Sequence, residues 1–199
     1  MINITNFRFL INNDICNVTP VAIVTIVHTA AENKKARDII RSDSGPLSLI
    51  NCFKQSLRTS WGSPNISEYV FKLVFLLGRI AFTVVLVINH QNPGATPSQS
   101  LQENITKENE EHHDIIQGDF LDTYRNLSYK NIMGKLWVSQ FCGQAKFVVK
   151  ADDDQYVDLH EVMVLTGRYS KSVEYMSNRF LLCPVWRGLP ILVKTGDDG

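Results

Sequence analysis

Residues 145–159, AKFVVKADDDQYVDL, join a short apolar strand to three adjacent carboxylates, Asp152, Asp153 and Asp154. Adjacent carboxylates repel one another, so an ordered turn at this point needs compensating charge. A hard divalent cation with oxygen ligands would supply it, and ligands of open α/β sheets bind at the carboxyl ends of strands. The pattern therefore points to a metal that bridges to phosphate. The alternative, which the triplet alone favours, is a solvated acidic turn that caps a helix.

Strands and helices alternate along the chain on both sides of this turn. Short runs rich in β-branched residues predict strands, and a 3.6-residue apolar spacing predicts amphipathic helices. We predict strands at 18–28, 71–77, 114–120, 145–150, 180–188 and 191–194, and helices at 33–41, 101–113, 129–142 and 158–165. This alternation predicts an α/β fold with a mostly parallel sheet.

The overall composition is that of a globular protein and excludes several classes. The chain has 199 residues, of which 44% are hydrophobic and 20% charged. These values exclude a wholly disordered chain, a collagen and a coiled coil. Lys and Arg together number 20, as do Asp and Glu, so the formal net charge is zero. Without a basic excess we expect no nucleic-acid partner.

Cysteines and glycosylation sequons bear on the cellular compartment. The chain has four cysteines, and no two of them form a CxxC pair, which argues against a zinc site. They are Cys16, Cys52, Cys142 and Cys183, and they allow three disulfide pairings. The chain also carries five N-x-S/T sequons, which favour a secreted or lumenal protein. Their asparagines are the candidate glycosylation sites Asn3, Asn17, Asn65, Asn104 and Asn126.

One segment, residues 70–88, is long enough to span a bilayer. Lys72 and Arg79 lie inside it, and each charge would cost about 2.5–3.5 kcal/mol near the membrane centre. Gly78 and Arg79 also divide the segment into two β-rich runs. Two strands, or a strand and a spacer, are therefore the favoured interpretation, and a membrane span is the alternative.

Several segments taken together resemble the β-1,3-glycosyltransferases of glycosyltransferase family 31. Residues 111–159 match, in order, the family patterns DII-x-x-DF-x-D-x-Y-x-NLT-x-K, W-x(4)-C and K-x-D-D-D-x-[FY]-V. FLLG at 75–78 and FLLCPVWRG at 180–188 resemble further family segments. The LIN motif and cysteine at 10–16 resemble the entry to the family's catalytic domain.

The resemblance implies a fold and a reaction. The fold is GT-A, a Rossmann-like α/β domain, here partial over residues 1–199 and incomplete at its C-terminus. The reaction moves a sugar from a UDP-sugar to the 3-hydroxyl of an acceptor glycan, with inversion, and galactosyltransferases are the most similar. The implied partners are the UDP-sugar and a glycan on a glycoprotein or glycolipid. The implied location is the lumenal face of the Golgi membrane, through an anchor absent from this chain.

The resemblance also implies roles for the acidic residues. Asp152, Asp153 and Asp154 occupy the DxD position of the family. Asp154 would be the principal Mn²⁺ ligand, Asp152 would be a second ligand nearer the nucleotide-sugar, and Asp153 would support them. We also expect a disulfide between Cys16 and Cys142, at the domain entry and the end of the helix.

Basic residues complete the implied donor site. Arg37 and Arg41 match the family pattern R-x-x-[IV]-R and would face the acidic residues across the UDP. Lys130 would also bind the nucleotide-sugar, and Lys150 is a further candidate. An inverting enzyme needs a carboxylate base, which we expect beyond Gly199.

Two stretches depart from the family pattern. In the family, the segment that corresponds to ARDIIR runs directly into the one that corresponds to RTSWG, but here residues 42–57 separate them. Residues 80–98, which follow FLLGR, are first apolar and then rich in Pro, Gly and Asn, at a place where the family proceeds towards its acidic segment. We expect both to be insertions. Two alternatives to an active transferase are a binding-only remnant that retains Mn²⁺ and UDP, and a small membrane or structural protein.

Overall fold

The computed structural model describes residues 7–17, 21–44, 70–80, 97–158, 161–162 and 164–166. Its elements, in chain order, are β1 (Phe9–Ile11), β2 (Val21–His28), α1 (Lys34–Ser44), β3 (Val70–Arg79), α3 (Pro97–His112), β4 (Ile115–Leu121), the 3-10 turn η2 (Tyr124–Asn126), α4 (Leu127–Phe141) and β5 (Phe147–Asp152).

The strands form one five-stranded sheet with the order β1-β4-β3-β2-β5. The pairs β3–β4, β2–β3 and β2–β5 are parallel, and β1 pairs antiparallel with β4 at one edge. His28, the last residue of β2, lies opposite Leu76 of β3 and Asp152 of β5. The carboxyl ends of these strands therefore meet at one edge of the sheet. The predicted α/β class and the mostly parallel sheet are confirmed.

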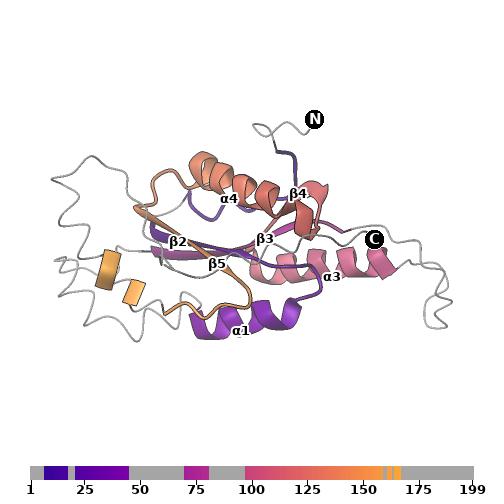
Figure 1. Cartoon of the computed structure of the whole chain (residues 1–199), viewed down its shortest axis with the longest axis horizontal. Coiled ribbons are helices and arrows are strands. Elements are labelled where there is room, and N and C mark those ends of the chain that lie inside the picture. The colour runs from indigo at the N-terminus through magenta and orange to yellow at the C-terminus, as the bar shows by residue number, and fades with distance from the viewer. Residues whose placement is uncertain are drawn as a thin grey trace, which may run out of the picture.

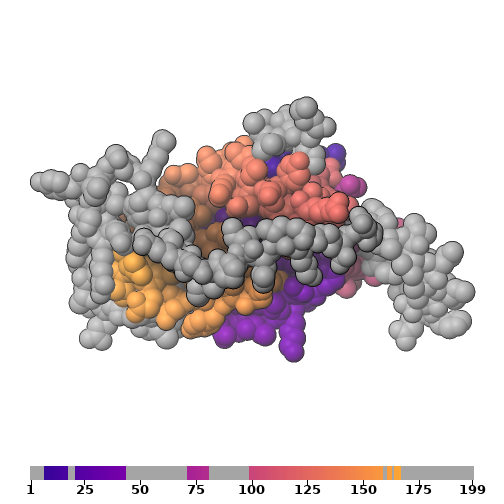
Figure 2. All heavy atoms as spheres, viewed as in Figure 1, coloured from indigo at the N-terminus to yellow at the C-terminus, as the bar shows by residue number. Residues whose placement is uncertain are grey.

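Helices cover both faces of the sheet. Figure 1 shows α4 on one face and α1 with α3 on the other, and Figure 2 shows α4 and α1 on opposite sides of the molecule. Alternate residues of each strand point to opposite faces, so β2 contributes Ile26 to the cluster under α4 and Val27 to the cluster under α1 and α3. This double burial explains why every residue of β2 is buried and why, apart from Thr25, those before His28 are apolar.

Helix α4 packs closely on the middle of the sheet. A Cβ atom at Gly134 would lie 2.3 Å from Cδ1 of Leu76, so a larger residue would require the Leu76 side chain to shift. Trp137 is fully buried, and its Nε1 donates a hydrogen bond to Oδ1 of Asn12 at 2.7 Å. The disulfide Cys16–Cys142 joins the end of α4 to the segment before β2, as expected. Cys52 and Cys183 lie outside the described residues.

The segment considered as a membrane span begins as an interior strand of the sheet. Val70–Arg79 forms β3 and pairs with β2 and β4, so a helical span over this half is wrong. Within the described ranges, no helix is long and apolar enough to cross a bilayer. The strand also continues through Gly78 instead of dividing there, and a Cβ at Gly78 would lie 2.8 Å from the backbone oxygen of Phe120.

The described ends of the two expected insertions are helical. Residues 42–44 continue α1, and α3 begins at Pro97. Ile80, directly after β3, is also described and packs against the core. The rest of both stretches lies outside the described residues, and the insertions stay a prediction. Helical residues at 161–162 and 164–166 agree with the helix predicted at 158–165. The strands predicted at 180–188 and 191–194 also lie outside the described residues.

Candidate functional site at the carboxyl ends of the strands

The acidic turn is attached to the end of β2 through Asp153. The backbone N–H of Asp153 donates to the carbonyl oxygen of His28 at 3.0 Å. The carboxylate Oδ2 of Asp153 accepts hydrogen bonds from Oγ1 of Thr29 at 2.6 Å and Nδ2 of Asn33 at 2.8 Å. Both donors follow β2 directly, so the turn is fixed by the segment that connects β2 to α1. Oδ2 of Asp153 is therefore committed to protein contacts, and the supporting role of Asp153 stays a prediction.

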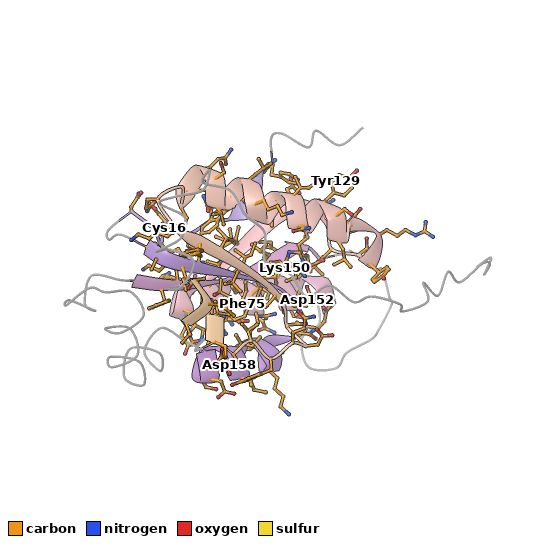
Figure 3. All side chains as sticks on the ribbon, turned by 60° about the vertical axis from the view of Figure 1, so that its left-hand side comes forward. Cys16, Phe75, Tyr129, Lys150, Asp152 and Asp158 are labelled. Atoms are coloured by element: carbon orange, nitrogen blue, oxygen red, sulfur yellow. A yellow bond between two sulfur atoms is a disulfide. The ribbon has the colours of Figure 1, made fainter. Side chains whose placement is uncertain are left out.

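The neighbouring carboxylates are in different environments. Oδ1 of Asp152 lies 2.5 Å from Nζ of Lys150, which is on the same face of β5 and is exposed. Asp154 is exposed and makes no hydrogen bond or ion pair with any residue in the described part of the chain. Figure 3 shows Asp152 and Lys150 together, at the end of the sheet away from Cys16. Asp152 and Asp154 are thus the two carboxylates of the turn that a ligand can engage.

These two carboxylates fit a hard cation that also binds phosphate. Mg²⁺-type sites use one or two carboxylates together with substrate phosphate oxygens and water. No group of three or more His, Cys, Asp or Glu side chains in the described ranges is arranged to hold a metal by itself. A cation at this turn would need oxygen atoms from a bound ligand, and the ligand set of Asp154 and Asp152 stays a prediction.

Lys130 is buried, and its ammonium group contacts protein acceptors. Nζ donates to the backbone oxygen of Thr29 at 2.9 Å and lies 2.6 Å from Oδ1 of Asp122. The other oxygen of Asp122 accepts the backbone N–H of Gly78 at 2.8 Å. One ion pair thus ties α4 to the ends of β2, β3 and β4. This position favours a structural contribution of Lys130 to the site, and its predicted nucleotide contact stays untested.

His28 is a residue of this edge that the sequence did not reveal. It is 7% exposed, and its pKa is lowered to about 4, chiefly by burial and next by the charge of Lys150. The imidazole is therefore neutral at physiological pH, although Nδ1 lies 3.7 Å from Oδ1 of Asp152. Its Nε2 has no hydrogen-bond partner among the described residues. A histidine at the end of a largely apolar strand was the available signal.

Arg37 is fully buried, and all five of its N–H donors are satisfied by protein. Nε and Nη2 bind the two carboxylate oxygens of Glu108 at 2.8 and 2.7 Å. The remaining contacts go to the backbone oxygens of Ala30 and Ala31 and to Oγ1 of Thr29. No donor remains for a nucleotide, so the geometry favours a positioning role for Arg37 over the predicted direct contact.

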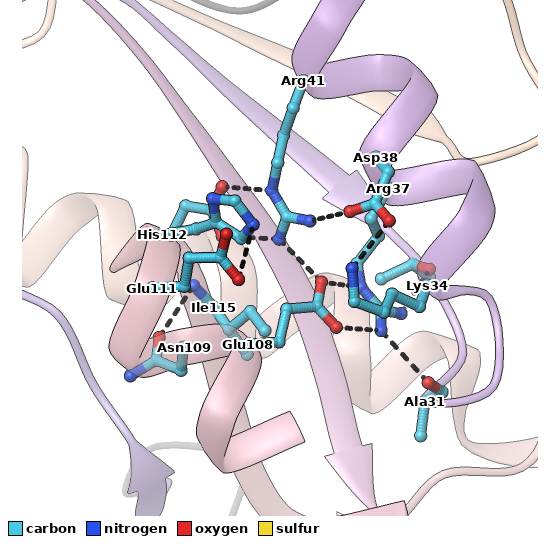
Figure 4. A network of polar contacts seen from close by, with 12 residues as sticks. Ala31, Lys34, Arg37, Asp38, Arg41, Glu108, Asn109, Glu111, His112 and Ile115 are labelled. Carbon is cyan, nitrogen blue, oxygen red and sulfur yellow. Dashed lines mark hydrogen bonds and ion pairs between the residues drawn. The ribbon is translucent and has the colours of Figure 1, made fainter. Parts of the chain in front are cut away.

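Arg41 belongs to the same network, which Figure 4 shows in close-up. It binds both oxygens of Asp114 at 2.8 Å, and Nη2 lies 2.7 Å from Oε1 of Glu108. Burial opposes the charged form of Glu108, but the hydrogen bonds from the two arginines outweigh it and lower the pKa of this carboxyl. Burial likewise opposes the charge of Arg41, yet its acidic partners raise the pKa of the guanidinium. Arg41 therefore lies in an ion-pair cluster instead of facing the acidic turn.

A pocket of about 250 Å³ adjoins the acidic turn on the α1 face of the sheet. Ala36, Ile39 and Ile40 of α1 line one wall, and Ala151 lies on the β5 side. Polar side chains also line the pocket, namely residues 152–155, Thr25 and Asp43. A ligand with an uncharged ring next to a charged group would fit this pocket.

The candidate glycosylation sites differ in their surroundings. Asn104 is exposed on α3, and Asn17 is exposed with its amide next to the carboxylate of Asp14. Asn126 is half-buried, and its Nδ2 donates to the backbone oxygen of Leu121 at 2.8 Å. Asn3 and Asn65 lie outside the described residues. Glycosylation at all five stays a prediction.

Comparison with known proteins places the chain among glycosyltransferases. A family model described as Galactosyltransferase matches residues 54–187. Lactosylceramide 1,3-N-acetyl-beta-D-glucosaminyltransferase A of Xenopus laevis is 32% identical over 190 residues, which cover 93% of this chain and 42% of that protein. Beta-1,3-galactosyltransferase 1 of Mus musculus is 30% identical over 164 residues, which cover 81% of this chain and 40% of that protein.

The matched relatives are longer than the chain, which spans about two fifths of their length. The family match nevertheless covers well over half of the 199 residues and includes β3, β4, α4, β5 and the acidic turn. The chain belongs to the galactosyltransferase family, glycosyltransferase family 31.

Proposed function

We propose that this chain is part of an inverting β-1,3-glycosyltransferase that transfers a sugar from a UDP-sugar to the 3-hydroxyl of an acceptor glycan. Family membership supports a transferase. The observation that carries the proposal is the acidic turn at the carboxyl end of β5, where Asp153 is fixed by Thr29 and Asn33. The central order β4-β3-β2-β5 of parallel strands supports a GT-A fold, in which this edge receives the donor.

The donor site would be completed by Mn²⁺. In this proposal Asp154 is the principal protein ligand and Asp152 the second, while oxygens of the UDP diphosphate complete the coordination. The metal ion, when bound, supplies a positive charge that stabilises the leaving diphosphate. Asp154 has no partner among the described residues and Asp152 is paired with the exposed Lys150. Because these two carboxylates alone do not complete a coordination shell, Mn²⁺ binding is expected to strengthen when UDP is present.

Basic residues around the turn would have two different roles. Lys150 is exposed and paired with Asp152, so it can exchange this partner for a phosphate oxygen when a cation occupies the carboxylate. Lys130 and Arg37 are buried and bonded to the segment after β2, so they would keep that segment in place. Inverting transfer also requires a base for the acceptor hydroxyl, and we assign none among the described residues.

The disulfide and the sequons support a location in the Golgi lumen. Disulfides persist in oxidising compartments, and the disulfide Cys16–Cys142 joins the segment before β2 to the end of α4. The names of the relatives give two sugars to test, galactose and N-acetylglucosamine, and a lactose-type acceptor.

Donor turnover tests the proposal. Release of UDP from UDP-galactose and from UDP-N-acetylglucosamine would be measured with Mn²⁺, with and without lactose, alongside Asp154→Ala. We expect slow UDP release from one donor and none from the variant, and stimulation by lactose would show that the chain also contains the base. UDP binding without any release would identify a binding-only remnant, and folded protein without either would refute the proposal.

A further inference from the structure

Glu108 holds a buried position on α3 from which it binds the start of α1. Its side chain is 1% exposed and forms a bidentate pair with Arg37. A buried carboxylate of this kind is costly unless its partners are placed to satisfy it. Here the partner lies 71 residues away in the sequence, so the pair links two helices on the same face of the sheet.

Arg37 transmits this link to the segment that follows β2. Beyond the two bonds to Glu108, it donates to the backbone oxygen of Ala30 at 2.6 Å and that of Ala31 at 3.1 Å. Its Nη1 also reaches Oγ1 of Thr29 at 3.4 Å. Figure 4 shows Arg37 between Glu108 and Ala31. A charged group thus fixes three consecutive residues of a connecting segment.

That segment in turn fixes the acidic turn. Thr29 accepts from Arg37 and donates to the Asp153 carboxylate at 2.6 Å, and Asn33 donates to the same oxygen at 2.8 Å. Hydrogen bonds arranged in a chain polarise and strengthen one another in a low-dielectric interior. The chain of contacts runs without interruption from Glu108 through Arg37 and Thr29 to Asp153.

We infer that Glu108 is a positioning residue for the acidic turn. It acts through Arg37 and Thr29, and it holds Asp153 so that Asp152 and Asp154 present their carboxylates at the edge of the sheet. The inference rests on the proposed function for its consequence in nucleotide binding. The statement that Glu108 holds the acidic turn in place does not depend on that function.

The variant Glu108→Gln tests this inference, and Asp114→Asn is the matched control. Glutamine retains the shape but removes the charge that faces Arg37. Asp114 belongs to the same cluster but binds Arg41, whose hydrogen bonds and ion pairs go to Asp38, Glu108 and Asp114 and not to the segment after β2. Arg41 keeps Glu108 and Asp38 as partners in the control. Both variants are expected to lower the melting temperature.

Two measurements on the full chain separate positioning from general stability. Hydrogen exchange of the ligand-free protein should accelerate at residues 152–155 in Glu108→Gln and stay unchanged there in Asp114→Asn. Calorimetric titration of UDP in Mn²⁺ should show roughly tenfold weaker binding in Glu108→Gln only, as found when outer partners of metal ligands are removed.

A third variant, Asp153→Ala, tests whether the effect passes through the turn. Adding Glu108→Gln to Asp153→Ala should cause no further loss of affinity, whereas an additive loss would contradict the inference. Equal exchange at residues 152–155 in all proteins would overturn it. If the wild-type chain binds no UDP, the proposed function fails while the exchange measurement still decides the inference. If Glu108→Gln does not fold, Arg37→Lys, which retains the charge but loses the fork of donors, replaces it in both measurements.

Discussion

The two ends of the parallel strands are held by different chemistry. At the amino ends, the disulfide Cys16–Cys142 and the buried Trp137 join α4 to the sheet through covalent and apolar contacts. At the carboxyl ends, the ion pairs Lys130–Asp122 and Arg37–Glu108 lie beneath the surface. Buried charges stabilise less than apolar packing of the same volume, because they lose their hydration. The comparison indicates that the amino ends maintain the fold and the carboxyl ends maintain a charged site.

Replacing Trp137 by Ala should produce the largest loss of stability. The change removes a fully buried indole and its bond to Asn12, and such truncations cost about 3–5 kcal/mol. Urea denaturation would measure the loss. Below the unfolding transition, the affinity for UDP in Mn²⁺ should equal that of the wild type. A weaker affinity in folded protein would show that packing at the amino ends of the strands also affects the site at their carboxyl ends.

Removing the disulfide by Cys16→Ala with Cys142→Ala should have the next largest effect. The bond joins residues separated by 126 positions, and loss of a native disulfide costs about 2–5 kcal/mol. Thermal unfolding followed by circular dichroism would report a lower melting temperature. Wild-type protein in a reducing buffer serves as a control and should resemble the variant. Unchanged stability in both would contradict this contribution of the amino ends.

A variant at the carboxyl ends, Lys130→Met, should lower both stability and affinity. It leaves Asp122 and the backbone oxygen of Thr29 without their shared donor, at a cost of about 1–3 kcal/mol. Because Thr29 also binds Asp153, UDP binding in Mn²⁺ should weaken as well. The double variant Lys130→Met with Asp122→Asn should recover part of the stability. Lower stability with unchanged affinity would place Lys130 among residues that only maintain the fold.

The smallest effect concerns acid stability. The pKa of Glu108 is lowered in the folded protein, so its contribution is present above its unfolded value of about 4.3 and is lost as pH falls through the folded value. Melting temperatures of wild type and Glu108→Gln should therefore differ by a constant amount from pH 5 to 7 and converge in more acidic buffers. A difference that widened on acidification would contradict the ion-paired state of Glu108.

Local patterns predicted most of the elements of this fold. The apolar run of β2, the helical spacing of α4 and the strand before the acidic turn each follow from neighbouring residues. The strand β3 was predicted to end at Leu77, but it continues to Arg79, which pairs with Leu121 of β4. At Gly78 the sheet packs closely against Phe120 and Asp122, which favours a residue without a side chain.

The candidate site was predicted only in part. The three carboxylates stand out in the sequence because they are consecutive. Glu108 does not, since it lies in a polar helical segment where a solvated surface is the ordinary expectation, and its partner Arg37 is distant in the sequence. Thr29 and Asn33 were hidden because their partners are also distant in the sequence, whereas Asp122 belongs to the family pattern DF-x-D. Their roles depend on the sheet that brings the strand ends together.

Calorimetric titration of UDP into the wild-type chain and into Asp154→Ala, each with and without Mn²⁺, tests the central claim most directly. The turn is exposed at Asp154, so the variant should melt at the wild-type temperature. The account predicts saturable heat for the wild type in Mn²⁺, little without the metal, and no metal-dependent binding in Asp154→Ala. Equal UDP affinity in the two proteins, or affinity that does not depend on Mn²⁺, would contradict it.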